Sequence, residues 1–333
     1  MKKVLIYEAN SNQALSIAKY IKKHSNYYVI GLIEKNIKFN KKFYDKIIIE
    51  DFKKIDITEY DYILPMGANS TYLIVNKYKN LLFDNGINFS EKNLIVYNKT
   101  KILEVANNLD IPIPKTYYKK ENIKSFPCFY KEDFENGGGM RGIANNINDI
   151  PKYNKLIFQE YIDTPSTYGV GFLAKNGEIL TYIIHKEVIS YPQVGGSAVV
   201  IEEFKDKRLL EYTKILLKEL NYSGWGLAEF KYCNKREDFV FMEINGKFWA
   251  SIEYMLINNS KFLNYILGIE YKVIKVSKIL FINRLFAYPF IDIIKNFKYL
   301  FGSYIVKESS VIYQLIRKIA PNFLIYIIKR FAK

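Results

Sequence analysis

The chain has 333 residues, of which 49% are hydrophobic and 16% aromatic, and its formal net charge is +15 at pH 7. This composition excludes disorder as the main state and leaves room for two or three domains. Two cysteines, Cys128 and Cys233, are too few for a disulfide framework, so we expect buried thiols in a reducing, cytoplasmic location. The short apolar run before Glu8 excludes the apolar core of a signal peptide.

The N-terminal part of the chain alternates predicted strands with predicted helices. We expect helices at 11–23 and 69–79, and strands at 3–7, 28–33, 46–49 and 62–64. This alternation is typical of a small α/β domain with a parallel sheet. The four residues after the first strand, Glu8 to Ser11, lack the glycines of a dinucleotide fingerprint, so we expect no cofactor there.

The middle of the chain reads as strands with two flanking helices. The helices are expected before Pro112 and at 206–221, and the strands at 127–131, 156–162, 168–174 and 178–187. The strand that ends at residue 187 carries His185 and Lys186. We interpret His185 as a structural histidine and Lys186 as a candidate contact for an anion.

A glycine cluster follows the lysine-tipped strand that ends at Lys131. Clustered glycines let backbone N–H groups approach phosphate oxygens without a side-chain clash, and here they are Gly137, Gly138, Gly139 and Gly142. Residues 143–153 are polar and broken instead of helical, which excludes a Rossmann fingerprint. No Walker A motif or protein-kinase signature occurs either.

A polar turn joins two predicted strands at residues 227–232 and 239–244. If this hairpin is symmetric about Arg236, Glu229 faces Glu243, and Asn245 points to the same side. The opposite side is then a core surface, made of Ala228, Phe230, Tyr232, Val240, Met242 and Ile244. Facing carboxylates repel, and a divalent cation would remove that repulsion. Because Mg²⁺ prefers carboxylate and amide oxygens, the hairpin predicts a magnesium site, with a solvated pair of acids as the alternative.

Taken in chain order, these features resemble the ATP-grasp family, close to the branch that contains the carbamoyl-phosphate synthase large subunit. The resemblance covers roughly residues 93–265 and rests on Lys99, Lys131, the loop at 136–142, Glu160, and the set of Glu229, Glu243 and Asn245.

The resemblance implies an α/β fold that is α+β in its ATP-grasp part. We expect an N-terminal Rossmann-like pre-ATP-grasp domain at 1–92, a two-subdomain ATP-grasp module at 93–268 and a basic helical C-terminal segment at 269–333. Within the module, we expect a flap subdomain at about 115–187.

The resemblance also implies roles for individual residues. Glu229, Glu243 and Asn245 would hold Mg²⁺, two ions in the family, with Mn²⁺ as an alternative. The residues that would contact ATP are Lys99, Lys131, Gly137, Gly138, Gly139, Gly142, Glu160, Tyr161, Ile162 and Asp163. Arg141, Lys186 and Lys247 would handle the transferred phosphate or the second substrate. The family usually has arginine where Lys247 stands, and lysine lacks the two-pronged geometry.

The expected activity is an ADP-forming carbon–nitrogen ligase that joins a small carboxylate to an amine through an acyl phosphate. The resemblance links such proteins to cell-surface glycan or natural-product pathways. Two alternatives stay open: a small-molecule kinase that stops at phosphorylation, and a non-catalytic ATP-binding or membrane-associated scaffold.

The C-terminal residues 271–333 hold 12 of the Lys and Arg residues and only 2 of the Asp and Glu residues. Their longest charge-free run, 319–328, is far below the ~20 residues that span a bilayer. We weigh three interpretations: helices packed on the body, peripheral attachment to anionic lipid on the inner face of a membrane, and nucleic-acid binding. No nucleic-acid-binding motif accompanies the charge, so we do not expect that partner.

Overall fold

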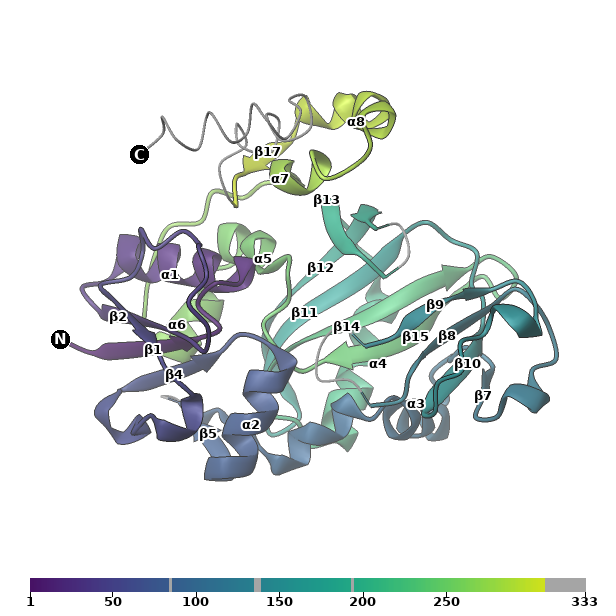
Figure 1. Cartoon of the computed structure of the whole chain (residues 1–333), viewed down its shortest axis with the longest axis horizontal. Helices are drawn as coiled ribbons and strands as arrows, with labels where there is room; N and C mark the ends of the chain where they lie inside the picture. Colours follow the sequence, from purple (N-terminus) through teal and green to yellow (C-terminus); the bar gives the residue numbers. More distant parts are fainter. Residues whose placement is uncertain (84–85, 135–138, 193–194, 309–333) are drawn as a thin grey trace.

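The computed structural model describes residues 1–83, 86–134, 139–192 and 195–308. These residues form a mixed α/β structure with four sheets, as the sequence predicted for the fold class. Figure 1 shows the N-terminal sheet at one end, the small sheet of β7–β10 at the other, and the largest sheet between them. In the described part of the chain, no helix combines the length and apolar character needed to cross a membrane.

The N-terminal sheet is parallel, in the order β3-β2-β1-β4. Its strands are β1 (Lys3–Tyr7), β2 (Tyr28–Ile33), β3 (Lys46–Ile49) and β4 (Tyr62–Pro65), and its helices are α1 (Asn12–His24) and α2 (Ala68–Tyr78). The Ser11 side chain caps α1 by accepting a hydrogen bond from the backbone N–H of Ala14. A two-stranded sheet, β5 (Asn80–Leu82) and β6 (Asn88–Ser90), follows.

The small antiparallel sheet has the order β7-β10-β8-β9. It comprises β7 (Thr116–Tyr117), β8 (Cys128–Glu132), β9 (Arg141–Ala144) and β10 (Leu156–Glu160), and α3 (Lys99–Asn108) precedes it. The Asn98 side chain caps α3 at the backbone N–H of Lys101. The sheet covers only part of the range expected for a flap, because the strands that follow Thr167 pair elsewhere.

The seven-stranded sheet has the order β15-β14-β11-β12-β13-β16-β17. Its strands are β11 (Thr167–Lys175), β12 (Glu178–Tyr191), β13 (Ser197–Glu203), β14 (Gly224–Cys233), β15 (Asp238–Asn245), β16 (Lys278–Phe281) and β17 (Tyr304–Val306). The helices that accompany it are α4 (Lys207–Glu219), α5 (Ile252–Asn258), α6 (Lys261–Leu267), α7 (Ile282–Leu285) and α8 (Phe290–Asn296).

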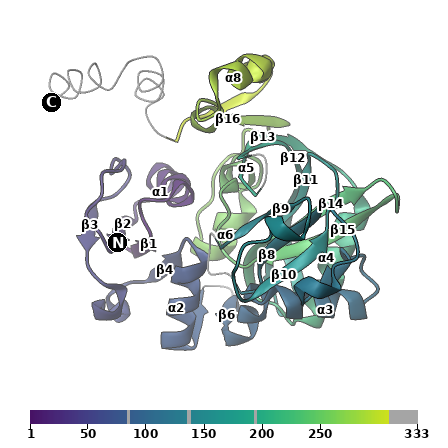
Figure 2. The ribbon, with the colours of Figure 1, turned by 45° about the vertical axis from the view of Figure 1, so that its right-hand side comes forward.

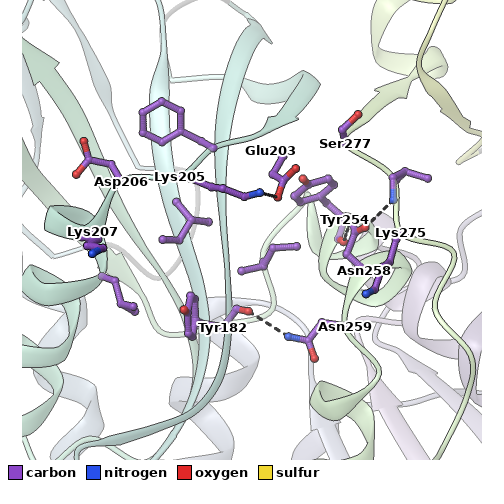
Figure 3. Close-up of a pocket in the computed structure, with 15 residues that line it drawn as sticks. Tyr182, Glu203, Lys205, Asp206, Lys207, Tyr254, Asn258, Asn259, Lys275 and Ser277 are labelled. Atoms are coloured by element: carbon purple, nitrogen blue, oxygen red, sulfur yellow. Dashed lines mark hydrogen bonds and ion pairs between the residues drawn. The ribbon is translucent and has the colours of Figure 1, made fainter.

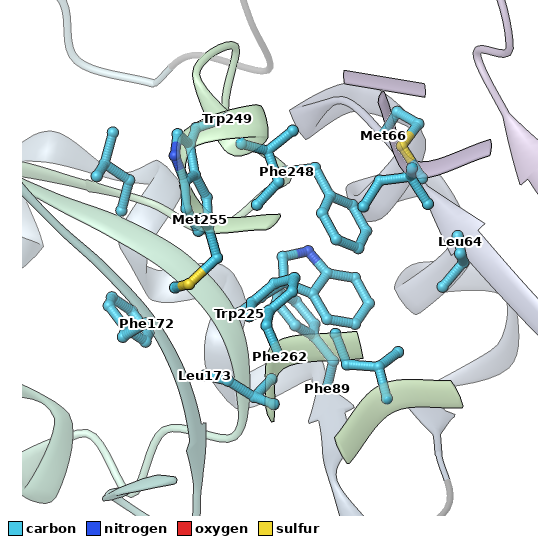
Figure 4. Close-up of a cluster of buried hydrophobic side chains, with 14 of the residues drawn as sticks. Leu64, Met66, Phe89, Phe172, Leu173, Trp225, Phe248, Trp249, Met255 and Phe262 are labelled. Atoms are coloured by element: carbon cyan, nitrogen blue, oxygen red, sulfur yellow. The ribbon is translucent and has the colours of Figure 1, made fainter. Parts of the chain in front are cut away.

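One large aromatic core joins the N-terminal sheet to the seven-stranded sheet. Figure 4 shows Trp225 and Phe248 at its centre, with Leu64 and Met66 of the N-terminal part beside them. The Trp225 and Phe248 rings stack with their centroids 4.4 Å apart, and both side chains are buried. Because Phe248 lies three residues after Asn245, this packing fixes the end of β15 in place.

The hairpin of β14 and β15 has a β-bulge that the sequence did not reveal. Glu229 does pair with Glu243, but Phe230 pairs with Phe241, so Met242 is an extra residue in β15. Val240 and Met242, which we expected on the core side, instead pack with Ile162 on the other face of the sheet. Phe241 takes the core position, together with Phe239.

The described part of the C-terminal segment contains strands as well as helices, whereas we expected helices alone. It adds β16 to the large sheet, continues through α7, α8 and the 3₁₀ turn η7 (Phe297–Leu300), and returns to the same sheet as β17. Arg284 anchors the segment by donating to the backbone oxygens of Ala198 at 2.6 Å and Ala250 at 2.7 Å and by pairing with Glu308. The helical patterns expected after residue 309 lie outside the described residues.

Candidate active site

The two carboxylates of the hairpin face each other across neighbouring strands. Glu229 of β14 lies directly opposite Glu243 of β15, and Asn245 projects from the same face. The Asn245 amide nitrogen donates to Glu229 Oε1 at 2.9 Å and to Glu243 Oε1 at 3.4 Å. In the described chain, no three His, Cys, Asp or Glu side chains form a metal cluster, so the set here is two carboxylates and an amide.

The two carboxylates have opposite electrostatic environments. Burial and the nearby Glu243 raise the pKa of Glu229 above its usual range. Burial also disfavours the charged form of Glu243, but Lys131 and Lys99 outweigh that effect and hold its pKa below the usual range. Because the two pKa values are pushed apart, the pair keeps one proton on Glu229, and a cation between the carboxylates would displace that proton.

Two buried lysines from different elements point at Glu243. Lys131, in β8, places its Nζ 3.2 Å from Glu243 Oε2 and donates to the backbone oxygen of Met242. Lys99, the first residue of α3, has its Nζ 3.9 Å from the same carboxylate oxygen. Each is only 5% exposed, which is rare for lysine unless the charge has a partner. Burial and the neighbouring Lys99 lower the pKa of Lys131, although Glu243 opposes that shift.

A cavity of about 770 Å³ opens over this cluster. That volume falls within the usual range for small-molecule sites. Many of the residues singled out in the sequence line it, and they come from α3, from the small sheet, from the seven-stranded sheet and from the segments that follow β10 and β15. They are Lys99, Lys131, Arg141, Glu160, Tyr161, Ile162, Asp163, Glu229, Glu243, Asn245 and Lys247. The fold therefore brings together side chains that lie up to 148 positions apart in the chain (99 to 247).

Glu160 is held firmly at one wall of the cavity. Its carboxylate pairs with Arg236, from the hairpin turn, and accepts a hydrogen bond from the Lys115 backbone N–H at 2.9 Å. Arg236 also donates to the Ile113 backbone oxygen at 2.8 Å. These contacts tie the small sheet to the hairpin, so Glu160 has a structural role besides any contact with a ligand.

Other predicted residues are placed differently. Lys186 does not line the cavity, because β12 turns its side chain to the opposite face, where its Nζ lies 5.8 Å from the centre of the Tyr168 ring. Gly142 packs against Tyr130, whose hydroxyl would lie 2.4 Å from an added Cβ. Gly139 is described but does not line the cavity, while Gly137 and Gly138 lie outside the described residues.

Four charged cavity residues were missed in the sequence: Glu187 and Lys231, discussed here, and Asp292 and Lys295 of α8. Glu187 follows Lys186 in β12 and therefore faces the site, where Ser190 Oγ donates to it at 3.1 Å. Burial raises the pKa of Glu187 to about 7, against the opposing effects of Ser190, Arg284 and Lys231. Lys231 lies two residues beyond Glu229 on the same face and donates to the Thr164 backbone oxygen at 3.1 Å. Strand alternation from Glu229 was the signal that could have identified Lys231.

The N-terminal sheet contributes a buried acid near Lys247. Glu8 follows β1 with a left-handed backbone (φ 60°), and its carboxylate accepts from Ser70 Oγ at 3.1 Å. Burial raises the pKa of Glu8, and the hydrogen bonds from Ser70 and Gly67 and the field of Lys247 oppose that shift. The stretch after β1, where we expected no cofactor, therefore lies within the electrostatic reach of the cluster.

A second cavity, of about 930 Å³, lies over β12, β13, α4 and α5 (Figure 3). Its polar groups are largely paired: Lys205 lies 2.9 Å from Glu203, and Asn259 donates to the Tyr182 backbone oxygen at 3.1 Å. Nearby, His185 is buried against Tyr254, and among described residues neither ring nitrogen has a hydrogen-bond partner. No candidate site residue from the sequence lines this cavity.

No family model matches the chain, and no curated protein matches it in sequence. Solved structures do match in fold. A biotin carboxylase complex from Campylobacter jejuni is 18% identical, with a TM-score of 0.61 over 81% of this chain and 72% of that one. An N5-carboxyaminoimidazole ribonucleotide synthetase from Thermotoga maritima is 16% identical, with a TM-score of 0.59 over 83% and 78%. A phosphoribosylglycinamide synthetase from Anaerococcus prevotii is also 16% identical, with a TM-score of 0.55 over 77% and 71%.

Proposed function

Because the chain has the ATP-grasp fold, we propose that it is an ATP-dependent ligase that joins a carboxylate to an amine through an acyl phosphate. The observation that carries the proposal is the cluster of Glu229, Glu243 and Asn245, with Lys99 and Lys131 against it, under a cavity of about 770 Å³. The fold alone does not identify the branch that contains carbamoyl-phosphate synthase, so that likeness stays an expectation from the sequence.

The residues of the cluster suit Mg²⁺. Two opposed carboxylates and an amide offer the oxygen ligands that this ion prefers, and phosphate oxygens complete its shell. The raised pKa of Glu229 supports a cation at this place, because a neighbouring cation would favour the charged form of that carboxyl. We propose that Glu229, Glu243 and Asn245 hold Mg²⁺ on ATP. In more detail, we propose that the site takes two ions and accepts Mn²⁺ in place of Mg²⁺.

We assign the nucleotide to the part of the cavity between the small sheet (β7–β10) and the seven-stranded sheet. Tyr161, Ile162 and Asp163 line that part, and Met242 offers the base an apolar surface. Lys99 and Lys131 would meet the phosphates, since their charges converge on the same carboxylate oxygen. The contact of the loop glycines with the phosphates stays an expectation from the sequence, because Gly137 and Gly138 lie outside the described residues.

When bound, MgATP supplies the phosphoryl group that activates the substrate carboxylate. Lys131, Arg141 and Lys247 line the cavity and offset negative charge as that group moves. The amine then attacks the activated carbonyl carbon, phosphate leaves, and the attacking nitrogen gives up a proton. Product analysis separates a ligase from a kinase: an amide with ADP and phosphate, or a stable phosphorylated product with ADP.

For the two substrates, we propose only the chemical class. We infer a small carboxylate and an amine from a cell-surface glycan or natural-product pathway, on the strength of the resemblance in the sequence. We also propose a cytoplasmic location with peripheral contact between residues 271–333 and an anionic membrane, because that segment carries 12 basic and only 2 acidic residues.

Calorimetric titration of ATP into the purified chain, with and without Mg²⁺, tests the proposal. We expect binding that depends on Mg²⁺ and that Glu243→Gln weakens at least tenfold, because the variant loses a charged ligand. Glu178→Gln, which changes an exposed acid at the start of β12, is the matched control and should bind like the wild type. A folded wild-type protein that binds no ATP would exclude both the ligase and the kinase.

A further inference from the structure

An exposed apolar ridge runs along α8 and η7. We define the ridge as Ile291, Ile294, Phe297 and Phe301, whose exposed fractions are 58%, 54%, 50% and 72%. Single exposed apolar side chains are normal on protein surfaces, whereas a contiguous group marks a surface that meets a partner. Figure 1 and Figure 2 both place α8 at the outer edge of the described structure.

The ridge is not the face by which α8 packs on the hydrophobic core. The buried face of α8 is already occupied, because Ile293 is 7% exposed and packs with Leu285 and Tyr288 beneath the helix. Ile291 and Ile294 lie three positions apart, on the side of the helix turned away from that contact. The helix therefore carries a second apolar face that the described fold does not use.

The surroundings of the ridge are basic. Lys298 lies in η7 between Phe297 and Phe301, and Lys295, which also lines the cavity, pairs with the one acid of α8, Asp292, at 3.7 Å. Glu308, the other acid after residue 270, is paired with Arg284. Apolar side chains framed by lysines suit the interface of a bilayer that contains anionic lipid.

The opposite edge of α8 belongs to the cavity. Asp292, Lys295 and Asn296 line it together with Tyr288, and Tyr288 is fixed there because its hydroxyl donates to the Ser190 backbone oxygen at 2.6 Å. One short helix thus borders the cavity on one side and carries the ridge on the other. A surface that meets the ridge therefore lies beside the cavity mouth.

We propose that the ridge of α8 and η7 docks the protein on an anionic membrane surface and so holds the cavity mouth beside the lipid headgroups. The occupant is a bilayer, not a second copy of the chain, because the ridge is flanked by positive charge that two copies would bring together. The proposal specifies the membrane contact proposed above and is independent of the ligase activity.

Sedimentation of the full chain with vesicles tests the proposal. We expect binding to phosphatidylcholine vesicles that contain phosphatidylglycerol, weaker binding to phosphatidylcholine alone, and a loss of binding as salt rises. Ile294→Ser and Phe301→Ser should each weaken binding about tenfold, since each removes an apolar side chain from the bilayer. Ile215→Ser, which changes a 41% exposed isoleucine on α4, is the matched control and should leave binding unchanged.

Three outcomes would overturn the proposal. The first is no binding of the wild type to anionic vesicles at low salt. The second is binding that Ile294→Ser and Phe301→Ser leave intact, which would place the contact elsewhere, for example in the residues after 308. The third is a concentration-dependent dimer that Ile294→Ser dissociates, which would make the ridge an interface between copies. ATP binding, measured on the same samples, separates any of these results from a failure of the ligase proposal.

Discussion

Glu229→Gln should stabilise the protein when metal and nucleotide are removed. The pKa of the Glu229 carboxyl is raised from 4.5 to about 8, because it is buried and faces Glu243. At pH 7 the folded protein must therefore hold a proton that the unfolded chain releases. With 1.36 kcal/mol for each pH unit above 4.5, this costs about 3 kcal/mol. The amide of glutamine needs no proton and can still accept the hydrogen bond that Asn245 donates to Glu229.

The sign of this effect depends on pH. Below pH 4.5 both the folded and the unfolded forms of Glu229 are protonated, so the substitution gains nothing. Between pH 4.5 and about 8 the gain grows, and above that range it is constant. We expect a gain in the free energy of unfolding of about 2–3 kcal/mol at pH 7 and a gain of less than about 1 kcal/mol near pH 5.

Urea unfolding in the presence of a chelator, at a series of pH values, measures this gain. Glu178→Gln serves as the control and should stay within about 0.5 kcal/mol of the wild type. Adding MgATP should reverse the order, because the wild type gains binding free energy that Glu229→Gln loses. A gain that is the same at pH 5 and pH 8, or a loss of stability in a folded variant, would refute the reasoning.

Three further predictions concern other buried charges. Lys131→Met should weaken MgATP binding about tenfold or more in calorimetry, because a charged partner of the phosphates is lost; unchanged affinity would contradict its assignment. Arg284→Met should lower the free energy of unfolding by about 3–5 kcal/mol, since Glu308 stays buried without its partner; urea unfolding at pH 7 checks this. Burial lowers the pKa of His185 to about 4, so the wild type should lose up to about 3 kcal/mol as pH falls from 6.5 to 4, and His185→Gln should remove that loss.

The elements that frame the site could be predicted from the sequence because each has a local signal. The alternation of side chains in β14 and β15 placed Glu229 opposite Glu243, and the structure confirms that pairing. Lys99 at the start of a helix and Lys131 near the end of a strand were also visible, but not that both point at Glu243. That convergence depends on how the small sheet packs on the large one, which no local pattern encodes.

The errors have equally local causes. Lys186 was chosen over its neighbour Glu187 because lysine suits an anion, but a strand turns adjacent side chains to opposite faces. Strands β16 and β17 were missed because three or four apolar residues among lysines do not distinguish a strand from a helix. No local sequence pattern identifies Glu8 as a residue near the site, because its proximity to Lys247 arises from contact between parts of the chain that are far apart in the sequence.

The extra residue in β15 lets two neighbours in the sequence serve the same side of the sheet. In a regular strand, adjacent side chains point to opposite faces of the sheet. Because of the bulge, Met242 and Glu243 both line the cavity, so the apolar surface proposed for the base and the acid proposed for the metal are neighbours in the sequence. Removing Met242 would leave the pairs Phe230–Phe241 and Glu229–Glu243 intact, and it would delete the apolar floor together with the backbone oxygen to which Lys131 donates. A single-codon deletion or insertion at this position is thus an evolutionary step that changes how the cavity holds its ligand while sparing the paired acids.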